Sequence, residues 1–182
     1  MSLKTMHKLL FIWDWDEEER WLNEMSAQGW HFVKYSFPFR YTFEQGEPGA
    51  YQYQLQAMEH GFGTKETQDY LAFLRDMNIE LADSYLFWAY LRKPNDGQPF
   101  ELFSDVESKM KHMRRFSLIP SLCTIMLALN LIFFAPTLWT YGGFWGIALV
   151  LLEVVLVLLM VYGATRMLVK YSELEKQKRL HE

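Results

Sequence analysis

Apolar and polar residues alternate along several short segments of the first hundred residues. The clearest case is 51–56, where Tyr51, Tyr53 and Leu55 are separated by glutamines. Successive side chains of a strand point to opposite faces, so this pattern predicts a strand with one buried face. On the same grounds we expect strands at 8–13, 30–35, 37–43, 51–56, 79–82, 85–92 and 100–103.

Two segments between these strands have apolar residues three and four positions apart, which is the period of a helix. The first is capped by Asp16 and continues with glutamates that suit a helix start, and Gly29 ends it in a left-handed conformation. The second runs over 64–77 and ends at Asn78. The apolar face of the first helix consists of Trp21, Leu22 and Met25.

The two halves of this region resemble each other when the chain is shifted by forty-nine positions. The matching pairs are Trp21 with Tyr70, Leu22 with Leu71, Met25 with Leu74, Gly29 with Asn78, Phe32 with Leu81, Tyr41 with Tyr90 and Tyr51 with Phe100. We therefore predict a duplicated β-α-β-β unit. The expected fold class is α+β, with one antiparallel sheet and two helices on one face, related to ferredoxin-like architectures.

The hydrophobic pattern changes completely after residue 115. Residues 116–165 contain one side chain that is charged at neutral pH, Glu153. A membrane-spanning helix needs about 20 apolar residues, so this run predicts a hairpin of two transmembrane helices. Pro136 and the glycines at 142 and 143 indicate where the chain turns.

The charges flanking this run predict its orientation. Basic residues precede and follow it, whereas the connecting loop contains no Lys or Arg and is rich in aromatic residues. The positive-inside rule then places both termini in the cytoplasm of a multi-pass protein of the cell membrane. The predicted segments are a cytosolic domain (1–103), a juxtamembrane helix (104–115) opened by the capping box Ser104-Asp105-Val106-Glu107, a first span (116–135), an extracytoplasmic loop (136–142), a second span (143–165) and a basic cytosolic tail (166–182).

Composition excludes several functions. Residues 1–108 carry nine Lys or Arg and eighteen Asp or Glu, so the domain is too acidic to bind the phosphates of nucleic acid. Cys123 is the only cysteine and lies in the apolar run, so no disulfide forms within the chain. The five histidines lack ligand spacing, and we find no nucleophile or phosphate motif. We therefore expect no metal, no cofactor and no enzymatic activity.

Glu153 is the unusual residue of the apolar run, because an ionised carboxylate inside a bilayer is costly. Thr124 lies at a similar depth on the first span and Asn130 lies nearer the outer face. One interpretation of Glu153 is a site that responds to protons or cations, or a contact with another membrane protein. The other is polar glue that holds the hairpin or a homo-oligomer together.

Aromatic residues are dense in the domain, with twenty-two Phe, Tyr and Trp in residues 1–108. The candidate surface for a ligand or partner consists of Trp13, Asp14, Trp15, Trp21 and Trp30. Aromatic rings beside carboxylates bind organic cations, so one interpretation is a site for a cationic or amphiphilic small molecule. The other interpretation is that these rings form the core of a small sheet.

Several motifs also resemble a known family. They are Phe11-Ile12-Trp13-Asp14-Trp15, Glu18-Glu19-Arg20-Trp21-Leu22-Asn23-Glu24-Met25, Gln28-Gly29-Trp30-His31, Phe39-Arg40-Tyr41-Thr42-Phe43-Glu44, Gly46-Glu47-Pro48-Gly49, Tyr51-Gln52-Tyr53, Tyr90-Leu91-Arg92-Lys93-Pro94 and Glu101-Leu102-Phe103-Ser104-Asp105. Over residues 7–110 the chain resembles the bacterial domain of unknown function 2812. The resemblance implies a membrane protein of Gram-positive bacteria encoded beside PadR-type regulators, with a regulatory or stress-linked role and no catalytic residues to transfer.

Two functions are compatible with this sequence. The first is a membrane-anchored, non-enzymatic sensor or adaptor whose cytosolic domain binds a protein partner or a small amphiphile. The alternative is an accessory subunit of a membrane complex, such as a transporter, that docks through Glu153 and Asn130 in the lipid bilayer.

Overall fold

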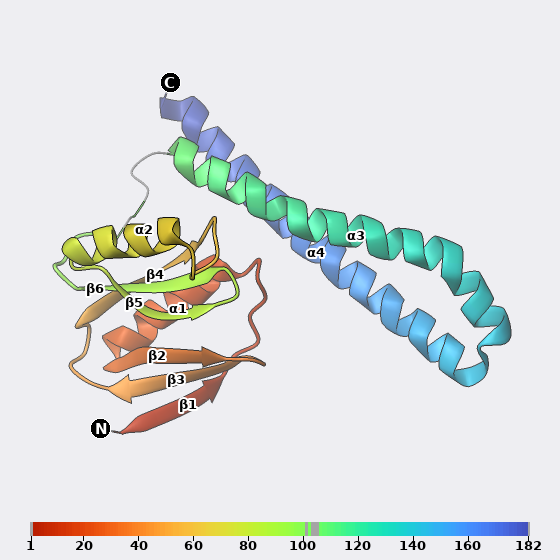
Figure 1. Cartoon of the computed structure of the whole chain (residues 1–182), viewed down its shortest axis with the longest axis horizontal. Coiled ribbons are helices and arrows are strands. Elements are labelled where there is room, and N and C mark those ends of the chain that lie inside the picture. Colours follow the sequence, from red (N-terminus) through yellow and green to blue (C-terminus); the bar gives the residue numbers. More distant parts are fainter. Residues whose placement is uncertain (1, 101, 103–105, 182) are drawn as a thin grey trace. The chain divides into compact units, whose positions relative to one another are not determined.

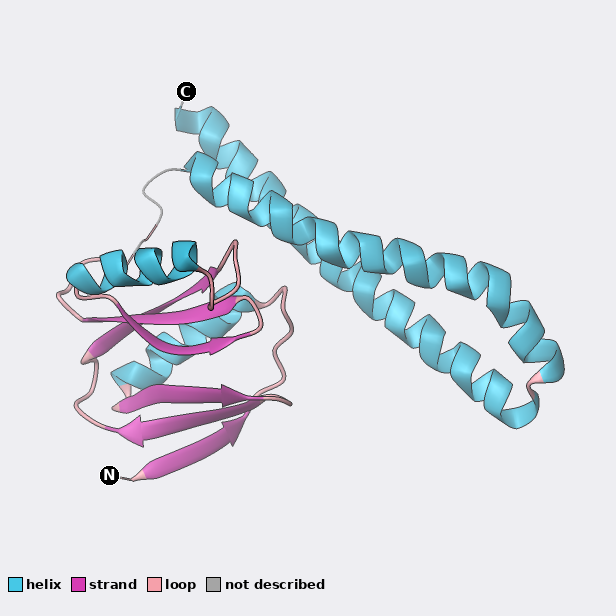
Figure 2. Cartoon of the chain, in the orientation of Figure 1, coloured by secondary structure: helices cyan, strands magenta, loops and turns pink. Residues whose placement is uncertain are grey.

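The computed structural model describes residues 2–100, 102 and 106–181, and its chain divides into two compact units, Met1–Leu102 and Phe103–Glu182. Figure 2 shows that the first unit mixes strands with helices and that the second contains helices alone. The first unit is called the N-terminal domain below and the second the apolar hairpin. The division falls one residue before the predicted end of the domain.

The N-terminal domain contains two successive β-α-β-β units, each with an antiparallel sheet of three strands (Figure 1). The last strand of each unit lies between the first two, so the orders are β1-β3-β2 and β4-β6-β5. This is a split β-α-β arrangement, which ferredoxin-like architectures share. The elements are β1 Leu3–His7, α1 Trp15–Ala27, β2 Trp30–Ser36, β3 Arg40–Gln45, β4 Tyr51–Ala57, α2 Lys65–Asp76, β5 Glu80–Tyr85 and β6 Trp88–Pro94.

The two units agree in detail at the shift of forty-nine positions. The register of β2 slips between Phe32 and Lys34, and the register of β5 slips at the equivalent residues, Leu81 and Asp83. Gly29 and its equivalent Asn78 both have left-handed backbone conformations, with φ of 82° and 59°. The α+β fold and the predicted helix ends at these two residues are therefore confirmed.

The six strands do not form the single sheet that we expected. β2 and β5 are neighbours but belong to different sheets, and each has a bulge in its pairing with β3 or β6. Between these two strands, the backbone N–H of Tyr35 donates to the carboxylate of Asp83 (2.7 Å) in place of a carbonyl group. A bulge increases the local twist of a strand, which opposes regular pairing between β2 and β5. The two helices also do not cover one face of one sheet as predicted. α1 contacts β2 and β4, whereas α2 contacts β5.

Aromatic rings form much of the core of the N-terminal domain. Trp21 of α1 contacts Tyr41 and Phe43 of β3 edge to face, with ring centroids 5.0 and 5.4 Å apart. Phe32 of β2 is fully buried and lies 4.9 Å from Tyr90 of β6. Such pairs contribute roughly 0.5–1.5 kcal/mol each beyond the burial of their area. These contacts join the two sheets and α1 into one packed unit.

The predicted strand at 8–13 is wrong. These residues form a loop in which the backbone N–H of Asp14 donates to the carbonyl of Phe11 (2.8 Å), and the first strand lies earlier, at Leu3–His7. Leu10 and Trp13 are buried although they are three positions apart, a spacing that a flat strand does not place on one face.

Other predicted boundaries also move. Pro38 lacks a backbone N–H and Phe39 has a φ of 56°, so β3 begins only at Arg40. The β5–β6 turn lies at Leu86, whose φ is 54°, later than predicted. α1 begins at Trp15 with Asp14 as its N-cap instead of Asp16.

The last predicted strand, 100–103, is not found at Phe100 and Leu102. Residues 101 and 103 of that segment are outside the described residues. The same is true of Ser104 and Asp105 of the predicted capping box.

The apolar hairpin consists of α3 Val106–Tyr141 and α4 Gly143–His181, which contact each other along their length. Two segments, Ser121–Tyr141 and Gly143–Glu173, are long and apolar enough to cross a membrane. Many of their large apolar side chains are exposed on the protein surface, as lipid contact requires. The composition and length of these helices are therefore consistent with membrane association.

The predicted helix end at 135 and the predicted loop at 136–142 are wrong. α3 continues through Pro136 to Tyr141, and Gly142 alone separates it from α4. A proline within a helix costs one backbone hydrogen bond, and helices in membranes tolerate this when neighbouring groups compensate. The hydroxyl of Thr140 donates to the carbonyl oxygen of Pro136 (2.7 Å). The turn requires glycine, because a Cβ on Gly142 would collide with the carbonyl oxygen of Leu138.

Candidate functional site

A buried carboxylate lies where the two β-α-β-β units meet. Glu18 is on the first turn of α1 and is 8% exposed. The hydroxyl groups of Tyr41 and Tyr90 both donate to its Oε1 atom, at 2.9 and 2.7 Å. Tyr41 of β3 and Tyr90 of β6 are equivalent at the shift of forty-nine positions, so one side chain from each unit binds the same oxygen.

The environment of Glu18 opposes its ionisation. Burial raises the pKa of the Glu18 carboxyl group, and the hydrogen bonds from Tyr90 and Tyr41 and the positive charge of Lys8 reduce this increase. Burial and the adjacent carboxylate also raise the pKa of both tyrosines well above the usual value. The tyrosines therefore stay protonated and act as donors, and the carboxylate is the acceptor.

An aromatic cavity of about 90 Å³ adjoins this carboxylate. Trp15 and Trp88 lie nearly parallel on its wall, with centroids 6.4 Å apart and planes 25° apart. Tyr35 and Tyr85 contribute another pair, 4.6 Å apart. The residues that line this aromatic cavity are Leu10, Phe11, Ile12, Trp15, Glu18, Tyr35, Tyr41, Tyr85, Leu86, Trp88 and Tyr90.

The local folding of each segment explains how these residues meet. Trp15 and Glu18 are three positions apart on α1 and therefore share a face of the helix. Tyr35 and Tyr85 lie near the ends of the equivalent strands β2 and β5, just beyond the two bulges. The duplication thus places the ends of four strands around one helix N-terminus. Ring faces attract cations, and a carboxylate provides the counter-charge, so this arrangement suits a positively charged group.

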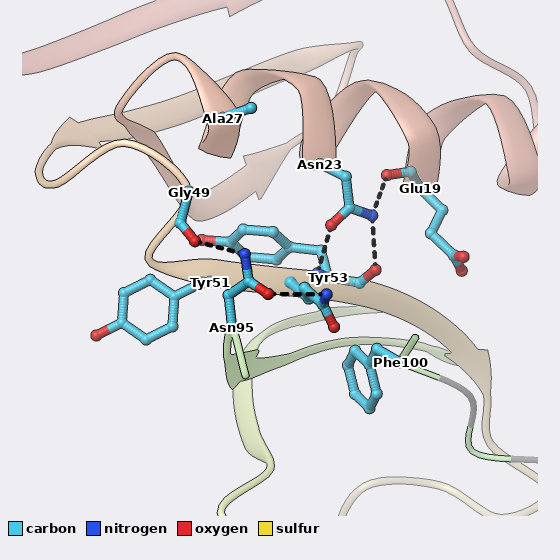
Figure 3. A pocket seen from close by; sticks show the side chains of 9 residues that line it. Glu19, Asn23, Ala27, Gly49, Tyr51, Tyr53, Asn95 and Phe100 are labelled. Carbon is cyan, nitrogen blue, oxygen red and sulfur yellow. Dashed lines mark hydrogen bonds between the residues drawn. The ribbon is translucent and has the colours of Figure 1, made fainter. Parts of the chain in front are cut away.

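A second pocket, of about 350 Å³, lies between α1 and β4. Figure 3 shows that the side chains of Asn23, Asn95 and Gln52 bond to each other or to the backbone. Asn95 donates to the carbonyl of Gly49 (2.9 Å) and accepts from Gln52 (3.0 Å). The amides of Asn23 and Asn95 are therefore occupied within the protein, whereas the buried Oε1 of Gln52 and the hydroxyl of Tyr53 have no hydrogen-bond partner among the described residues. The lining residues of this second pocket are Glu19, Asn23, Ala27, Gly49, Tyr51, Gln52, Tyr53, Asn95 and Phe100.

Comparison with known proteins identifies a family. The model of a family described as "Protein of unknown function (DUF2812)" matches residues 14–126, which is more than half of the chain. The chain belongs to the DUF2812 family. No curated protein and no solved structure matches it.

The DUF2812 match includes most of the aromatic cavity. Glu18, Tyr41 and Tyr90 all fall within residues 14–126, whereas Leu10, Phe11 and Ile12 of the preceding loop lie outside the match. The match also continues past Leu102 into the first part of α3. The family therefore includes both the domain and the beginning of the hairpin.

Only Trp15 of the five residues proposed from the sequence lines the aromatic cavity of this DUF2812 protein. Trp13 is buried and stacks on Phe11 with centroids 5.0 Å apart, and Trp21 belongs to the core. The carboxylate of the N-cap residue Asp14 accepts from the backbone N–H of Phe11 (3.2 Å). Trp30 is half-buried at the start of β2, outside the cavity lining. The ammonium nitrogen of Lys4 lies 4.9 Å from the centroid of its ring.

Sequence reasoning missed Glu18, because it attributed the acidic run at the start of α1 to helix capping. A usable signal was present in the spacing. Glu18 precedes Trp21, Leu22 and Met25 by three, four and seven positions, so it falls on their apolar face. An acidic residue within an apolar stripe is a candidate for a buried functional carboxylate.

The polar residues of the apolar hairpin differ in exposure. Glu153 and Thr124 are half-buried, whereas Asn130 is exposed on α3. Among the residues that the structure describes, no group of three or more His, Cys, Asp or Glu side chains is arranged to hold a metal ion.

Proposed function

We propose that this DUF2812 protein is a membrane-anchored, non-enzymatic sensor whose cytosolic domain binds a small amphiphilic molecule in the aromatic cavity. The observation that supports this proposal is the carboxylate of Glu18, which two tyrosines from different units bind next to an aromatic-walled cavity. Buried carboxylates are costly, and their presence beside a cavity is typical of functional sites.

The apolar hairpin supplies the membrane anchor in this proposal. The basic residues that flank it in the sequence favour a cytoplasmic location for both termini, and therefore for the domain. A regulatory role, encoded beside PadR-type regulators, is the expectation that the family resemblance carries. Two helices alone enclose no transport pathway, so anchoring is the simplest role for the hairpin.

A ligand screen tests the proposal. Full-length protein in lipid nanodiscs is screened by thermal unfolding against water-soluble amphiphiles, and each compound that stabilises it is repeated with Trp15→Leu. We expect Trp15→Leu to weaken the stabilisation at least fivefold in ligand concentration, because the ring lines the cavity. Trp30→Leu is the matched control, since Trp30 is also a half-buried tryptophan but lies outside the cavity lining.

Two results would contradict the sensor proposal. One is that no compound in the screen stabilises the full-length protein. The other is that Trp30→Leu weakens the response as much as Trp15→Leu, which would place the binding site outside the aromatic cavity.

One observation favours the alternative of an accessory subunit. Asn130 is exposed on α3 and Glu153 is half-buried on α4, so these polar groups reach the surface of a predominantly apolar hairpin. Polar side chains at such positions hydrogen-bond to neighbouring membrane helices. In this alternative the hairpin docks on a membrane complex, such as a transporter, and the domain is secondary.

A further inference from the structure

We infer that the aromatic cavity is a receptor for the methylated ammonium head group of an amphiphilic cation. This inference rests on the proposed function and names the chemical class of the ligand. It depends on three features of the cavity: the charged residue in its lining, the aromatic rings in its lining and its volume.

The cavity lining carries a negative charge, the carboxylate of Glu18, and one of its two oxygens accepts no described hydrogen bond. Among the residues that the structure describes, Glu18 is the one charged side chain in the lining. Both tyrosine hydroxyls donate to its Oε1 atom, and no described hydrogen bond involves its Oε2 atom. The ammonium of the nearby Lys8 lies over the ring of Trp21, 4.5 Å from the centroid. Glu18 lines the cavity, so a cation there would lie beside a carboxylate group whose Oε2 atom accepts no described hydrogen bond.

The walls suit an ammonium that carries methyl groups. Seven of the eleven lining residues are aromatic, and the other lining residues besides Glu18 are aliphatic. Methylated ammonium ions are weakly hydrated and bind to ring faces, as in the aromatic cages for choline and methyl-lysine. A primary ammonium needs three acceptors, whereas aromatic and aliphatic side chains make up most of this lining.

The volume limits what enters. A cavity of about 150 Å³ holds one benzene molecule, and a trimethylammonium group is about as large as benzene. The cavity of about 90 Å³ therefore encloses only part of such a head group, and the rest of the amphiphile stays outside. Leu86 of the β5–β6 turn is 69% exposed, so the lining of the cavity reaches the protein surface there. The ring centroid of Phe11 lies 6.0 Å from that of Phe39, which in turn lies 6.4 Å from that of Phe37. Phe37 is 70% exposed. This row of rings provides an apolar path for the hydrocarbon tail.

Protonation of Glu18 would compete with the cation. The titratable groups that act on it are Lys8 of the β1–α1 loop, Asp14 at the N-cap, Tyr41 of β3 and Tyr90 of β6. Because burial raises the pKa of Glu18, a cation should bind more tightly at pH 8 than at pH 5, where more of the carboxylate is protonated. A neutral ligand should show no such gain.

The test compares ligands that differ in charge alone. Full-length protein in nanodiscs of phosphatidylglycerol, which has no choline, is titrated at pH 8 by tryptophan fluorescence. The probes are choline, its uncharged isostere 3,3-dimethyl-1-butanol, and butyltrimethylammonium. We expect choline to bind at least tenfold more tightly than the isostere, and butyltrimethylammonium to bind more tightly than choline because of its tail.

Matched variants assign the charge effect to one residue. Glu18→Gln keeps the shape of the side chain and should lose about tenfold in affinity for choline while binding the isostere unchanged. Glu24→Gln removes the same charge from an exposed position of the same helix and should change neither affinity. If Glu18→Gln does not fold, Trp15→Leu and its control Trp30→Leu give the same comparison between cation and isostere.

The outcomes separate this inference from the proposed function. Equal affinity for choline and its isostere, or an unchanged preference for choline in Glu18→Gln, overturns the ammonium receptor and leaves a cavity for neutral amphiphiles. Absence of binding by all three probes overturns it as well, and the screen described above then decides whether the sensor proposal survives. If choline binds more tightly than butyltrimethylammonium, the proposed apolar path for the tail is overturned.

Discussion

Glu18 shows what a buried carboxylate costs a folded protein. It lies on the buried face of α1, where an apolar side chain would stabilise the domain more simply. Tyr41 and Tyr90 satisfy one of its oxygens, and burial still keeps its pKa above the usual value. The protein therefore retains a carboxylate that destabilises the folded state at neutral pH, as residues of a binding site often do.

This cost predicts how stability depends on pH. The folded state binds the Glu18 proton more tightly than the unfolded state, so this group contributes less stability as pH rises from the unfolded pKa through the folded pKa. Glu18→Gln should then raise the unfolding temperature at pH 8 relative to the original protein, and the gain should shrink towards pH 4. Each pKa unit of difference corresponds to about 1.4 kcal/mol.

Thermal unfolding of both proteins between pH 4 and pH 8 measures this difference, with Glu24→Gln as the exposed control. A gain for Glu18→Gln that is the same at pH 4 and pH 8 would show that Glu18 is not protonated more readily in the folded state.

At the level of elements, the two helices of the repeat have different tasks. α1 covers the free edge of β4, which pairs with β6 on one side only. The side chain of Asn23 binds both the N–H and the carbonyl of Tyr53, each at 2.8 Å (Figure 3). Glu19 accepts from the N–H of Leu55 (3.0 Å), and Ser26 donates to the carbonyl of Tyr51 (2.6 Å). An edge strand that is covered in this way cannot pair with another chain.

The equivalent positions of α2 lack this function. The residues at the shift of forty-nine positions are Gln68, Ala72 and Arg75. Ala72 has no side-chain hydrogen-bonding group, so α2 cannot satisfy the edge of a strand in the way that Asn23 does. The stripe of Glu19, Asn23 and Ser26 is therefore specific to the first unit and to its packing against the second.

Removal of Asn23 should expose this difference. Asn23→Ala leaves the N–H and carbonyl of Tyr53 without their partners, and we expect a loss of about 1–3 kcal/mol in the free energy of unfolding. Glu24→Ala, at the next and exposed position of α1, should change stability by less than about 0.5 kcal/mol. Denaturant unfolding of the full-length protein measures both values. Equal effects of the two substitutions would show that water replaces the Asn23 bonds at no cost.

The first strand illustrates what the repeat predicts and what local patterning does not. Residues 8–13, which we predicted to be a strand, form a loop in which Leu10 and Trp13 are buried. The shift of forty-nine positions places β4, which the sequence predicts clearly, on residues 2–8, and the structure has β1 at Leu3–His7. β1 is an edge strand with mostly exposed side chains, so hydrophobic alternation is weak there.

For the whole molecule, the proposed cytoplasmic location of both termini has a direct test. A Cys123→Ser protein receives one new cysteine, Ser2→Cys in the domain or Tyr141→Cys at the turn of the hairpin, both at exposed positions. In intact cells a membrane-impermeant maleimide should label the cysteine at 141 and should reach the one at 2 only after permeabilisation. The reverse labelling pattern would place the domain outside the cell and contradict the positive-inside prediction.

Glu153 distinguishes the two proposed functions. If the hairpin only anchors the domain, Glu153→Leu should insert at least as well as the original protein and keep ligand binding, because a charged group in a bilayer costs about 2.5–3.5 kcal/mol or more. If the hairpin docks on a complex, the same substitution should abolish crosslinks to the partner while the domain stays folded. Crosslinking in native membranes followed by mass spectrometry measures this, with the exposed Val155→Leu as control.

The sequence alone determined the features that depend on neighbouring positions and on composition. These are the mixed α+β domain, the repeat with its left-handed residues Gly29 and Asn78, the two long apolar helices and the family. Each follows from side-chain periodicity, backbone conformation or residue type, which are local or additive properties of a chain.

The tertiary structure decided the features that depend on residues far apart in the chain. It separated the strands into two sheets, placed α1 over the edge of β4 and brought Tyr41 and Tyr90 to the carboxylate of Glu18 across 23 and 72 positions. The sequence contained these residues, but hydrogen bonds between distant positions leave no periodic pattern, and burial of a single carboxylate depends on how whole elements pack.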